Sequence, residues 1–288
     1  TSDLVDELID LGYVQEAKTS ERRVGKPPTP LRINPDGAYS LGIHVDVDHM
    51  SAIAVNLAGD LLRREERPLD DLEPENASIE LARAVKRLMK ASAIPAERLL
   101  GIGLGTPGPF GVTGLSPPRL PGWDGLTLRT LLQEKTGFPV SLTNDGQCAT
   151  IAEWRFGEAA RGLTNFVYVY FGIGMGSGLM IHGATFGGAT GNAGEFGHLT
   201  VVPGGHPCIC GKRGCLETYV SVDSAIKHLS ARGVRIDSPA EFAATFDAGH
   251  PLIRDWIEQG VEPFRNGLNA LENLFDPQTI MIGGNAPA

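Results

Sequence analysis

The chain has 288 residues, with 34 acidic side chains against 25 basic ones, a formal net charge of −9 and 42% hydrophobic residues. This length and composition are typical of a globular protein with two domains. The apolar runs are well short of the roughly 20 residues of a membrane-spanning helix, so the sequence predicts neither a membrane protein nor a disordered tail. The net charge disfavours nucleic-acid binding over the whole surface, although an average can hide a basic patch.

The ends of the chain and its cysteines indicate a cytoplasmic protein. No secretory signal precedes the first helical pattern, and the absence of a starting Met suggests a trimmed or processed chain. Four cysteines are too few for a disulfide-rich secreted scaffold, and three of them fall within eight positions. This clustering favours a metal site over disulfides.

The first 37 residues combine a helix with a basic loop. Apolar residues at helical spacing over residues 2–11 predict an amphipathic helix that Gly12 ends. Short strands are expected on both sides of a Pro-rich loop, and residues 18–32 carry five basic side chains against one acidic. This order matches the second half of a winged helix-turn-helix, with the loop as the wing. The alternative is an N-terminal helix followed by a solvated loop.

From residue 38 the pattern alternates between strands and helices. A first series is expected to contain strands over 39–47, 52–57, 61–67, 99–104 and 139–142, and helices over 78–93, 127–136 and 146–156. A second series has strands over 165–171 and 178–181, with helices from residue 216 onward. The order predicts an α/β chain built from two related halves.

Three cysteines and a histidine form the strongest local pattern. Cys208, Cys210 and Cys215 share a Gly-containing loop that follows His198. Three thiolates and an imidazole are the ligands of a closed tetrahedral zinc site, which is structural because no position is left for water. His206 is a competing fourth ligand, and three buried or redox-active thiols without metal are the alternative.

Polar side chains gather near this loop and after one predicted strand. Asn144 and Asp145 follow a strand and begin a helix, at the end of the sheet where α/β proteins bind ligands. Glu195 precedes His198 by three positions, and Glu217 follows the last cysteine by two. Carboxylates and amides can hold adjacent hydroxyls of a sugar. Alone, each would be interpreted as a surface group or a helix cap, Asp145 as an N-cap in particular.

A glycine-rich segment over residues 172–178 joins two predicted strands. Its backbone amides could approach a phosphate. The segment precedes a strand rather than a helix, which excludes a dinucleotide-binding fingerprint. A tight hairpin without a ligand would need the same glycines.

Together these motifs resemble the ROK family of repressors and sugar kinases. The resemblance is carried by residues 101–110, 116–140, 143–146, 172–178, 194–198, 208–217 and 275–284. It implies an actin-like, ribonuclease-H-like two-lobed α/β sugar-kinase fold. It implies a structural zinc held by His198, Cys208, Cys210 and Cys215, and a sugar held by Asn144, Asp145, Glu195, His198 and Glu217. In the family's kinases, the residue matching Asp145 is the base that deprotonates the sugar hydroxyl.

Two departures from the kinase pattern indicate the regulator branch. The kinases carry an Asp-x-Gly-Gly-Thr-Lys phosphate loop where this chain has His44–His49, and both glycines are missing. Asp46 and Asp48 would repel a polyanion, and Val47 would crowd its approach to the backbone. Ile173 stands where the kinases usually carry Thr. ATP is therefore expected to bind poorly.

The sequence predicts a sugar-responsive, DNA-binding transcriptional regulator whose kinase-like body binds a sugar and changes the affinity for operator DNA. The DNA contacts are expected from Thr1, Ser2, Arg22, Arg23 and Lys26. The alternative is an ATP-dependent kinase of a hexose or amino sugar, with Asp145 as its base. A sugar phosphate held by residues 172–178 is a further possibility for the effector. The family resemblance also suggests a homodimer or homotetramer.

Three parts are expected along the chain. Residues 1–37 would be the partial winged helix-turn-helix, residues 38–142 the first α/β lobe, and residues 143–288 the second α/β lobe with the zinc loop. Compared with the family pattern, we expect the first helices of the DNA-binding module to precede residue 1 and the closing helices to follow residue 284.

Overall fold

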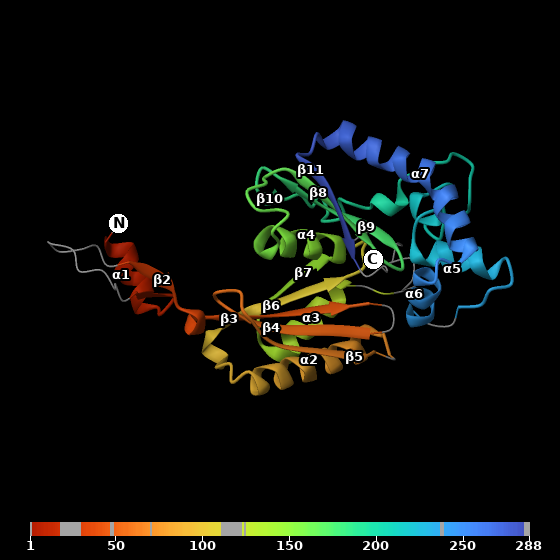
Figure 1. Cartoon of the computed structure of the whole chain (residues 1–288). Coiled ribbons are helices and arrows are strands. Elements are labelled where there is room, and N and C mark those ends of the chain that lie inside the picture. The colour runs from red at the N-terminus through yellow and green to blue at the C-terminus, as the bar shows by residue number, and fades with distance from the viewer. Residues whose placement is uncertain are drawn as a thin grey trace. The chain divides into compact units, whose positions relative to one another are not determined.

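The structure is a computed structural model that describes residues 2–17, 30–46, 49–69, 71–110, 123, 125–236 and 239–284 (Figure 1). The chain divides into two compact units. One consists of Thr1–Pro107 with Thr113–Thr143, and the other of Gly108–Val112 with Asn144–Ala288. The expected limits of three domains along the sequence stay a prediction.

The N-terminal segment contains the predicted helix and strands. Helix α1 (Ser2–Asp10) is followed by β1 (Val14–Glu16), which pairs antiparallel with β2 (Leu31–Ile33). Gly12 has the positive φ of +77° expected after a helix end. Of the residues predicted to contact DNA, Thr1, Arg22, Arg23 and Lys26 and the side chain of Ser2 lie outside the described part of the chain.

Arg98 joins this segment to the rest of the first unit. It ends the 3₁₀ turn η2 (Ala96–Arg98), and its guanidinium donates hydrogen bonds to the carbonyl oxygens of Leu11 at 3.2 Å and Gly37 at 2.8 Å. The side-chain amide of Asn34 adds a bond to the carbonyl oxygen of Gly12 at 2.8 Å. A cation at carbonyls that follow a helix also complements the helix dipole.

The first unit is built on a five-stranded mixed sheet. Its strands lie in the order β5-β4-β3-β6-β7, with β3 antiparallel to β4 and parallel to β6. The elements are β3 (Tyr39–Val45), β4 (His49–Asn56), β5 (Leu61–Pro68), α2 (Pro74–Ala91), β6 (Leu99–Thr106), α3 (Gly125–Thr136) and β7 (Val140–Asn144). Burial alternates along β3 and β4, because every second side chain faces the core.

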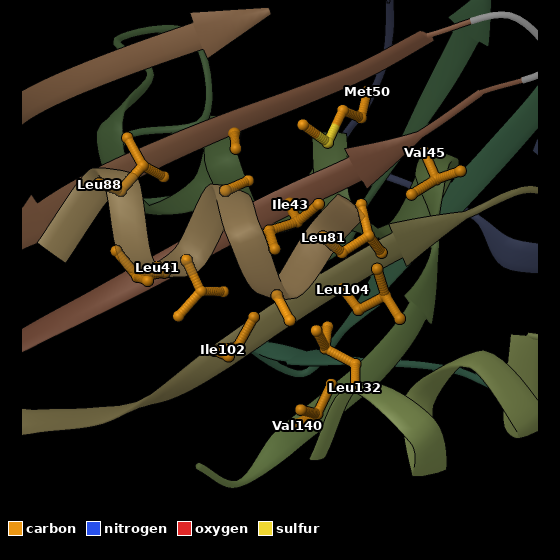
Figure 2. Close-up of a cluster of buried hydrophobic side chains, with 14 of the residues drawn as sticks. Leu41, Ile43, Val45, Met50, Leu81, Leu88, Ile102, Leu104, Leu132 and Val140 are labelled. Carbon is orange, nitrogen blue, oxygen red and sulfur yellow. The ribbon is translucent and has the colours of Figure 1, made fainter. Parts of the chain in front are cut away.

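Helix α2 covers this core. Its buried face includes Leu81 and Leu88, which lie among Leu41, Ile43 and Leu104 of the sheet (Figure 2). The predicted helix at residues 78–93 is confirmed, but it begins earlier, at Pro74. Proline is favoured in the first turn, where its missing N–H has no partner to lose.

The second unit repeats the arrangement with four strands. Their order is β10-β9-β8-β11, with β8 antiparallel to β9 and parallel to β11. The elements are α4 (Asp145–Phe156), β8 (Phe166–Phe171), β9 (Met175–Ile181), β10 (Ala184–Thr185), the 3₁₀ turns η3 (Phe196–His198) and η4 (Leu216–Thr218), α5 (Val222–Ser230), α6 (Pro239–Asp247), α7 (Pro251–Phe275) and β11 (Thr279–Gly284). An antiparallel pair followed by a parallel strand recurs in both sheets, which confirms the prediction of two related halves.

Several strand boundaries differ from the prediction: the strand expected at 52–57 begins at His49, the one expected at 99–104 ends at Thr106, and the one expected at 139–142 is Val140–Asn144. The strand expected at 178–181 begins at Met175, so Gly176 and Gly178 lie inside β9 and pair with Tyr170 and Tyr168. Helix α4 packs closely on the second of these glycines, Gly178, which is described below. The strand expected at 39–47 ends at Val45. No helix in the described ranges is long and apolar enough to span a membrane.

Candidate functional site

The first turn of α4 positions two of the expected site residues. Asn144 ends β7 and is the N-cap of α4, because its side-chain oxygen accepts a hydrogen bond from the Gln147 amide at 2.7 Å. The alternative interpretation of Asp145 as the N-cap is wrong, because Asn144 has that position. Asp145 is the first residue of the helix, and its Oδ1 accepts from the Gly146 amide at 2.8 Å.

Glycines allow α4 and the loop before Glu195 to approach β9. A Cβ on Gly178 would lie 2.0 Å from Thr150 Oγ1, and one on Gly146 would lie 2.8 Å from the Ser177 backbone. Ser177 donates both its amide, at 2.8 Å, and its hydroxyl, at 3.0 Å, to the Gly194 carbonyl. Strand β9 therefore fixes the start of α4 and the residue next to Glu195.

Three carboxylates are electrostatically coupled at this place. Glu217, in η4, is only 8% exposed. Burial raises the pKa of Glu195 to about 7, and the charges of Asp145 and Glu217 add to this shift, whereas Lys212 opposes it. A carboxyl group with this pKa can either donate to or accept from a hydroxyl near neutral pH. The structure thus brings Asp145, Glu195 and Glu217 together.

The four expected metal ligands also meet. One possible ligand atom from each of His198, Cys208, Cys210 and Cys215 lies within 4.8 Å of the others. The Sγ atoms of Cys210 and Cys215 are 3.6 Å apart, and Cys208 Sγ lies 3.5 Å from His198 Nδ1. In a tetrahedral zinc site with Zn–S bonds of ~2.3 Å, sulfur ligands are about 3.8 Å apart. The spacing and the ligand types therefore fit a zinc ion.

Local hydrogen bonds fold the cysteine loop. The Cys208 amide donates to the Lys212 carbonyl at 2.9 Å, and the turn between them contains Gly211 with a φ of +85°. The Lys212 ammonium donates to the His198 carbonyl at 2.7 Å. His206, the competing ligand, is not in the cluster, and its ring packs against Tyr219 with centroids 4.8 Å apart.

Glu217 connects the carboxylates to the metal cluster. Its Oε1 lies 3.6 Å from His198 Nδ1 and 3.6 Å from Cys208 Sγ. A residue expected to hold a sugar therefore contacts two residues expected to hold the metal. Loss of the metal would therefore be expected to change the position of a residue at the expected sugar site, and loss of the sugar to affect residues at the metal site.

Two carbonyls and one side chain of the glycine-rich turn make contacts within the protein. The carbonyls of Gly172 and Ile173 accept hydrogen bonds from the first amides of α5, Val222 N at 3.0 Å and Asp223 N at 3.2 Å. The Ile173 side chain packs against the apolar cluster formed by α5, α6 and α7. Ile173, at the position where kinases usually carry Thr, is thus part of an apolar cluster.

Sequence reasoning missed three residues near the carboxylates. Gly108 lies in the segment that joins the second unit, and a Cβ there would be 3.1 Å from Glu195 Oε1. Asn192 bonds the backbone of Phe110, 82 residues away. The sequence shows a glycine–proline turn around residue 108, but no nearby residue pattern indicates that this turn contacts Asn192 and Glu195.

Comparison with known proteins identifies the family. The sequence model of the ROK family matches residues 40–286. The chain belongs to the ROK family. Among curated ROK relatives, it is 31% identical to the xylose repressor of Caldicellulosiruptor bescii, over 99% of this chain and 75% of that protein. It is 32% identical to the glucokinase of Halalkalibacterium halodurans, over 85% of this chain and 80% of that protein.

Solved structures include both branches of the ROK family. A ROK transcriptional regulator homologous to the Escherichia coli Mlc protein is 26% identical, with a TM-score of 0.81, over 99% of this chain and 75% of that chain. The ROK hexokinase of Thermus thermophilus is 32% identical, with a TM-score of 0.70, over 86% of this chain and 84% of that chain. The expected sugar-kinase-like α/β fold is confirmed.

Proposed function

We propose that this ROK protein is a sugar-responsive transcriptional regulator that binds operator DNA through its N-terminal module. The observation that carries the proposal is the segment before residue 40. It lies outside the family match, yet repressor relatives align with 98–99% of this chain and a glucokinase with 85%. In the described residues, this segment contains α1 and the hairpin β1–β2, in the order of a recognition helix and wing.

The effector in this proposal is a sugar held by Asn144, Asp145, Glu195, His198 and Glu217. The clustering of three carboxylates beside a helix cap supports a polyhydroxylated ligand, because each carboxylate can accept from two hydroxyls. The same carboxylates disfavour a sugar phosphate, which would add negative charge. D-Xylose is the first probe, since several repressor relatives are named for xylose.

Zinc is the proposed metal, held by His198, Cys208, Cys210 and Cys215. Four protein ligands leave no open position, so the ion would supply stability rather than Lewis-acid chemistry. Glu217, in contact with two of these ligands, would be oriented by the closed loop.

Weak ATP binding is the second part of the proposal. The amides at the start of α5 donate to Gly172 and Ile173, so they are not free for a phosphate. Asp46 adds negative charge after β3, near the sequence position of the kinases' first phosphate loop. Val47 and Asp48 lie outside the described residues.

The proposal of a regulator is tested by measuring the binding of sugar and of DNA to the intact zinc-loaded protein. Calorimetry would report D-xylose and D-glucose binding, and gel-shift titration at fixed salt would report the affinity for duplexes selected by the protein from a random pool. We expect sugar to change the DNA affinity by about fivefold or more, which is a typical allosteric coupling. Sugar binding with unchanged DNA affinity would overturn the proposal.

A sugar kinase is the second candidate, because the family resemblance implies that Asp145 matches the catalytic base of the kinases and one kinase relative is 32% identical. A coupled ATP-turnover assay over a sugar panel separates the two functions. The regulator predicts no sugar-dependent turnover. The kinase predicts turnover that Asp145→Asn abolishes, since the amide cannot take the hydroxyl proton.

The remaining parts of the proposal concern assembly and DNA contacts. Repressors that bind two half-sites are dimers, and we propose a homodimer or homotetramer on this ground. Thr1, Ser2, Arg22, Arg23 and Lys26 are the proposed DNA contacts. Replacing Arg22 and Arg23 by Ala should reduce the salt dependence of DNA binding by about two charges if both contact phosphates.

A further inference from the structure

Asn192 uses the oxygen and the nitrogen of its side-chain amide to hold the backbone of one distant residue, Phe110. Its Oδ1 accepts a hydrogen bond from the Phe110 amide at 2.7 Å, and its Nδ2 donates to the Phe110 carbonyl at 2.8 Å. Nδ2 also bonds Thr190 Oγ1 at 3.0 Å. The side chain therefore pairs with the Phe110 backbone as a neighbouring strand would.

The segment held in this way borders the carboxylates. Phe110 is only 7% exposed, so its backbone groups need partners within the protein. Two residues earlier, a Cβ on Gly108 would lie 3.1 Å from Glu195 Oε1 and 3.9 Å from Asn144 Cβ. The backbone at Gly108 thus lies against two residues of the proposed sugar site.

Asn192 and Glu195 also belong to the same short loop, because only two residues separate them in the chain. The loop positions Glu195, and through Asn192 it positions the backbone that faces Glu195. Both sides of this part of the site are therefore fixed relative to one another by one side chain. Side chains that hold a binding backbone in register raise affinity by reducing the cost of ordering it.

We propose that Asn192 is a positioning residue that fixes Gly108–Phe110 as one wall of the sugar site, an inference that rests on the proposed sugar binding. Asn192 itself need not touch the sugar. A Cβ on Gly108 would lie 3.1 Å from Glu195 Oε1, so a side chain in this wall would force the Glu195 carboxylate to shift by a few tenths of an ångström.

The first test compares Asn192→Ala with Thr190→Val by calorimetry with D-xylose and D-glucose. Asn192→Ala removes both bonds to Phe110 and should weaken the binding of whichever sugar the wild type binds by about tenfold or more. Thr190→Val removes only the third bond and should bind as the wild type does. Equal affinity of Asn192→Ala and wild type would overturn the inference.

A pH profile separates positioning from a general structural role. Asn192→Asp keeps the acceptor for the Phe110 amide but places a second oxygen against the Phe110 carbonyl. Because a carboxylate oxygen held against the Phe110 carbonyl oxygen favours the protonated form, protonation should restore the donor as the pH falls. The ratio of its sugar dissociation constant to that of wild type should therefore narrow from pH 8 to pH 6, with zinc content checked at each pH. A ratio that does not change with pH would contradict positioning through these bonds.

If Asn192→Ala lowers the melting temperature, its weaker sugar binding could reflect lost stability. Gly108→Ala then tests the same wall of the sugar site independently. Its Cβ would press on Glu195, whereas the Cβ of the control Gly103→Ala would meet nothing closer than 3.9 Å. Weaker sugar binding by Gly108→Ala but not by Gly103→Ala supports the inference that Gly108–Phe110 is a wall of the sugar site. Unchanged sugar affinity of Gly108→Ala overturns it. A wild-type protein that binds neither sugar would instead contradict the proposed function.

Discussion

Cys148 shows how strongly the environment of α4 acts on a single side chain. It lies one helical turn after Asn144, beside the carboxylate of Asp145. Burial and this negative charge raise the pKa of the Cys148 thiol to about 12. The thiol is therefore neutral at any physiological pH and behaves as a small apolar group rather than as a nucleophile.

We expect Cys148 to react with iodoacetamide at pH 8 at least about a hundredfold more slowly in the folded protein than in urea, because the folded thiolate is scarce. Peptide mass spectrometry distinguishes it from the other three cysteines. The folded pKa lies above the unfolded one, so Cys148 also destabilises the fold once the pH rises above about 9. Cys148→Ala should reduce the loss of stability at high pH. Equal labelling rates in the two states would contradict the assignment.

At the scale of elements, the contact between α4 and β9 carries the site. Gly146 and Gly178 lie where the helix and the strand meet, and Thr150 donates its hydroxyl to the Gly146 carbonyl at 2.8 Å. The absence of two side chains is what lets the start of a helix approach a strand so closely. The placement of Asn144 and Asp145 depends on this approach.

Gly178→Ala should destabilise the fold by roughly 2–4 kcal/mol, because its Cβ would overlap Thr150 Oγ1 and the Gly146 carbonyl. Urea unfolding measures the loss. Gly103→Ala, on strand β6 of the other unit, places its Cβ no closer than 3.9 Å to the Leu41 carbonyl and is the matched control. If Gly178→Ala lowers the free energy of unfolding no more than Gly103→Ala does, α4 can shift away from β9.

Arg98 is the second contact between elements with a testable consequence. Arg98→Ala removes the bonds to Leu11 and Gly37, which lie at the two ends of the segment between α1 and β3. Amide hydrogen exchange in α1, β1 and β2 should become faster, since local opening then breaks fewer contacts. Arg83→Ala, which removes an exposed ion pair with Glu80, is the control. Unchanged exchange in Arg98→Ala would contradict the role of this contact.

The elements also show what the sequence could predict. Local periodicity predicted α1, α2 and α4, and the spacing of the cysteines predicted the metal ligands, because these features depend on residues close in the chain. The start of β9 at Met175 was missed, since glycine has low strand propensity and the local pattern does not show the pairing of Met175 and Gly176 with β8. The contacts of Arg98 and Asn192 span 61 to 87 residues, and no local pattern encodes them.

At the scale of the whole molecule, the chain passes between the two units at three peptide bonds, after Pro107, Val112 and Thr143. Gly108 and Asn144 each follow one of these bonds. Gly108 lies near both Asn144 and Glu195, since a Cβ on Gly108 would be 3.9 Å from Asn144 Cβ and 3.1 Å from Glu195 Oε1. If the proposed sugar orders Gly108 and Asn144, it orders residues that are directly bonded to the first unit, to which the N-terminal segment also belongs.

Loss of the metal should affect both stability and sugar binding. Cys210→Ser should release zinc, lower the melting temperature by at least about 5 °C and abolish sugar binding, because the loop that orients Glu217 loses its closure. Metal analysis, thermal unfolding and calorimetry measure the three effects. Cys148→Ser lies outside the cluster and should retain zinc. Zinc loss with unchanged sugar affinity would show that the two sites are independent.

The metal cluster has one more consequence, for the order of events during synthesis. Its four ligands all fall within the short stretch from His198 to Cys215, and the loop is closed by hydrogen bonds between near neighbours such as Cys208 and Lys212. Closing a short loop is fast and costs little entropy. If zinc binds as proposed, all four of its ligands leave the ribosome before α7 and β11, so the loop could close around the ion while the rest of the second unit is still being synthesised.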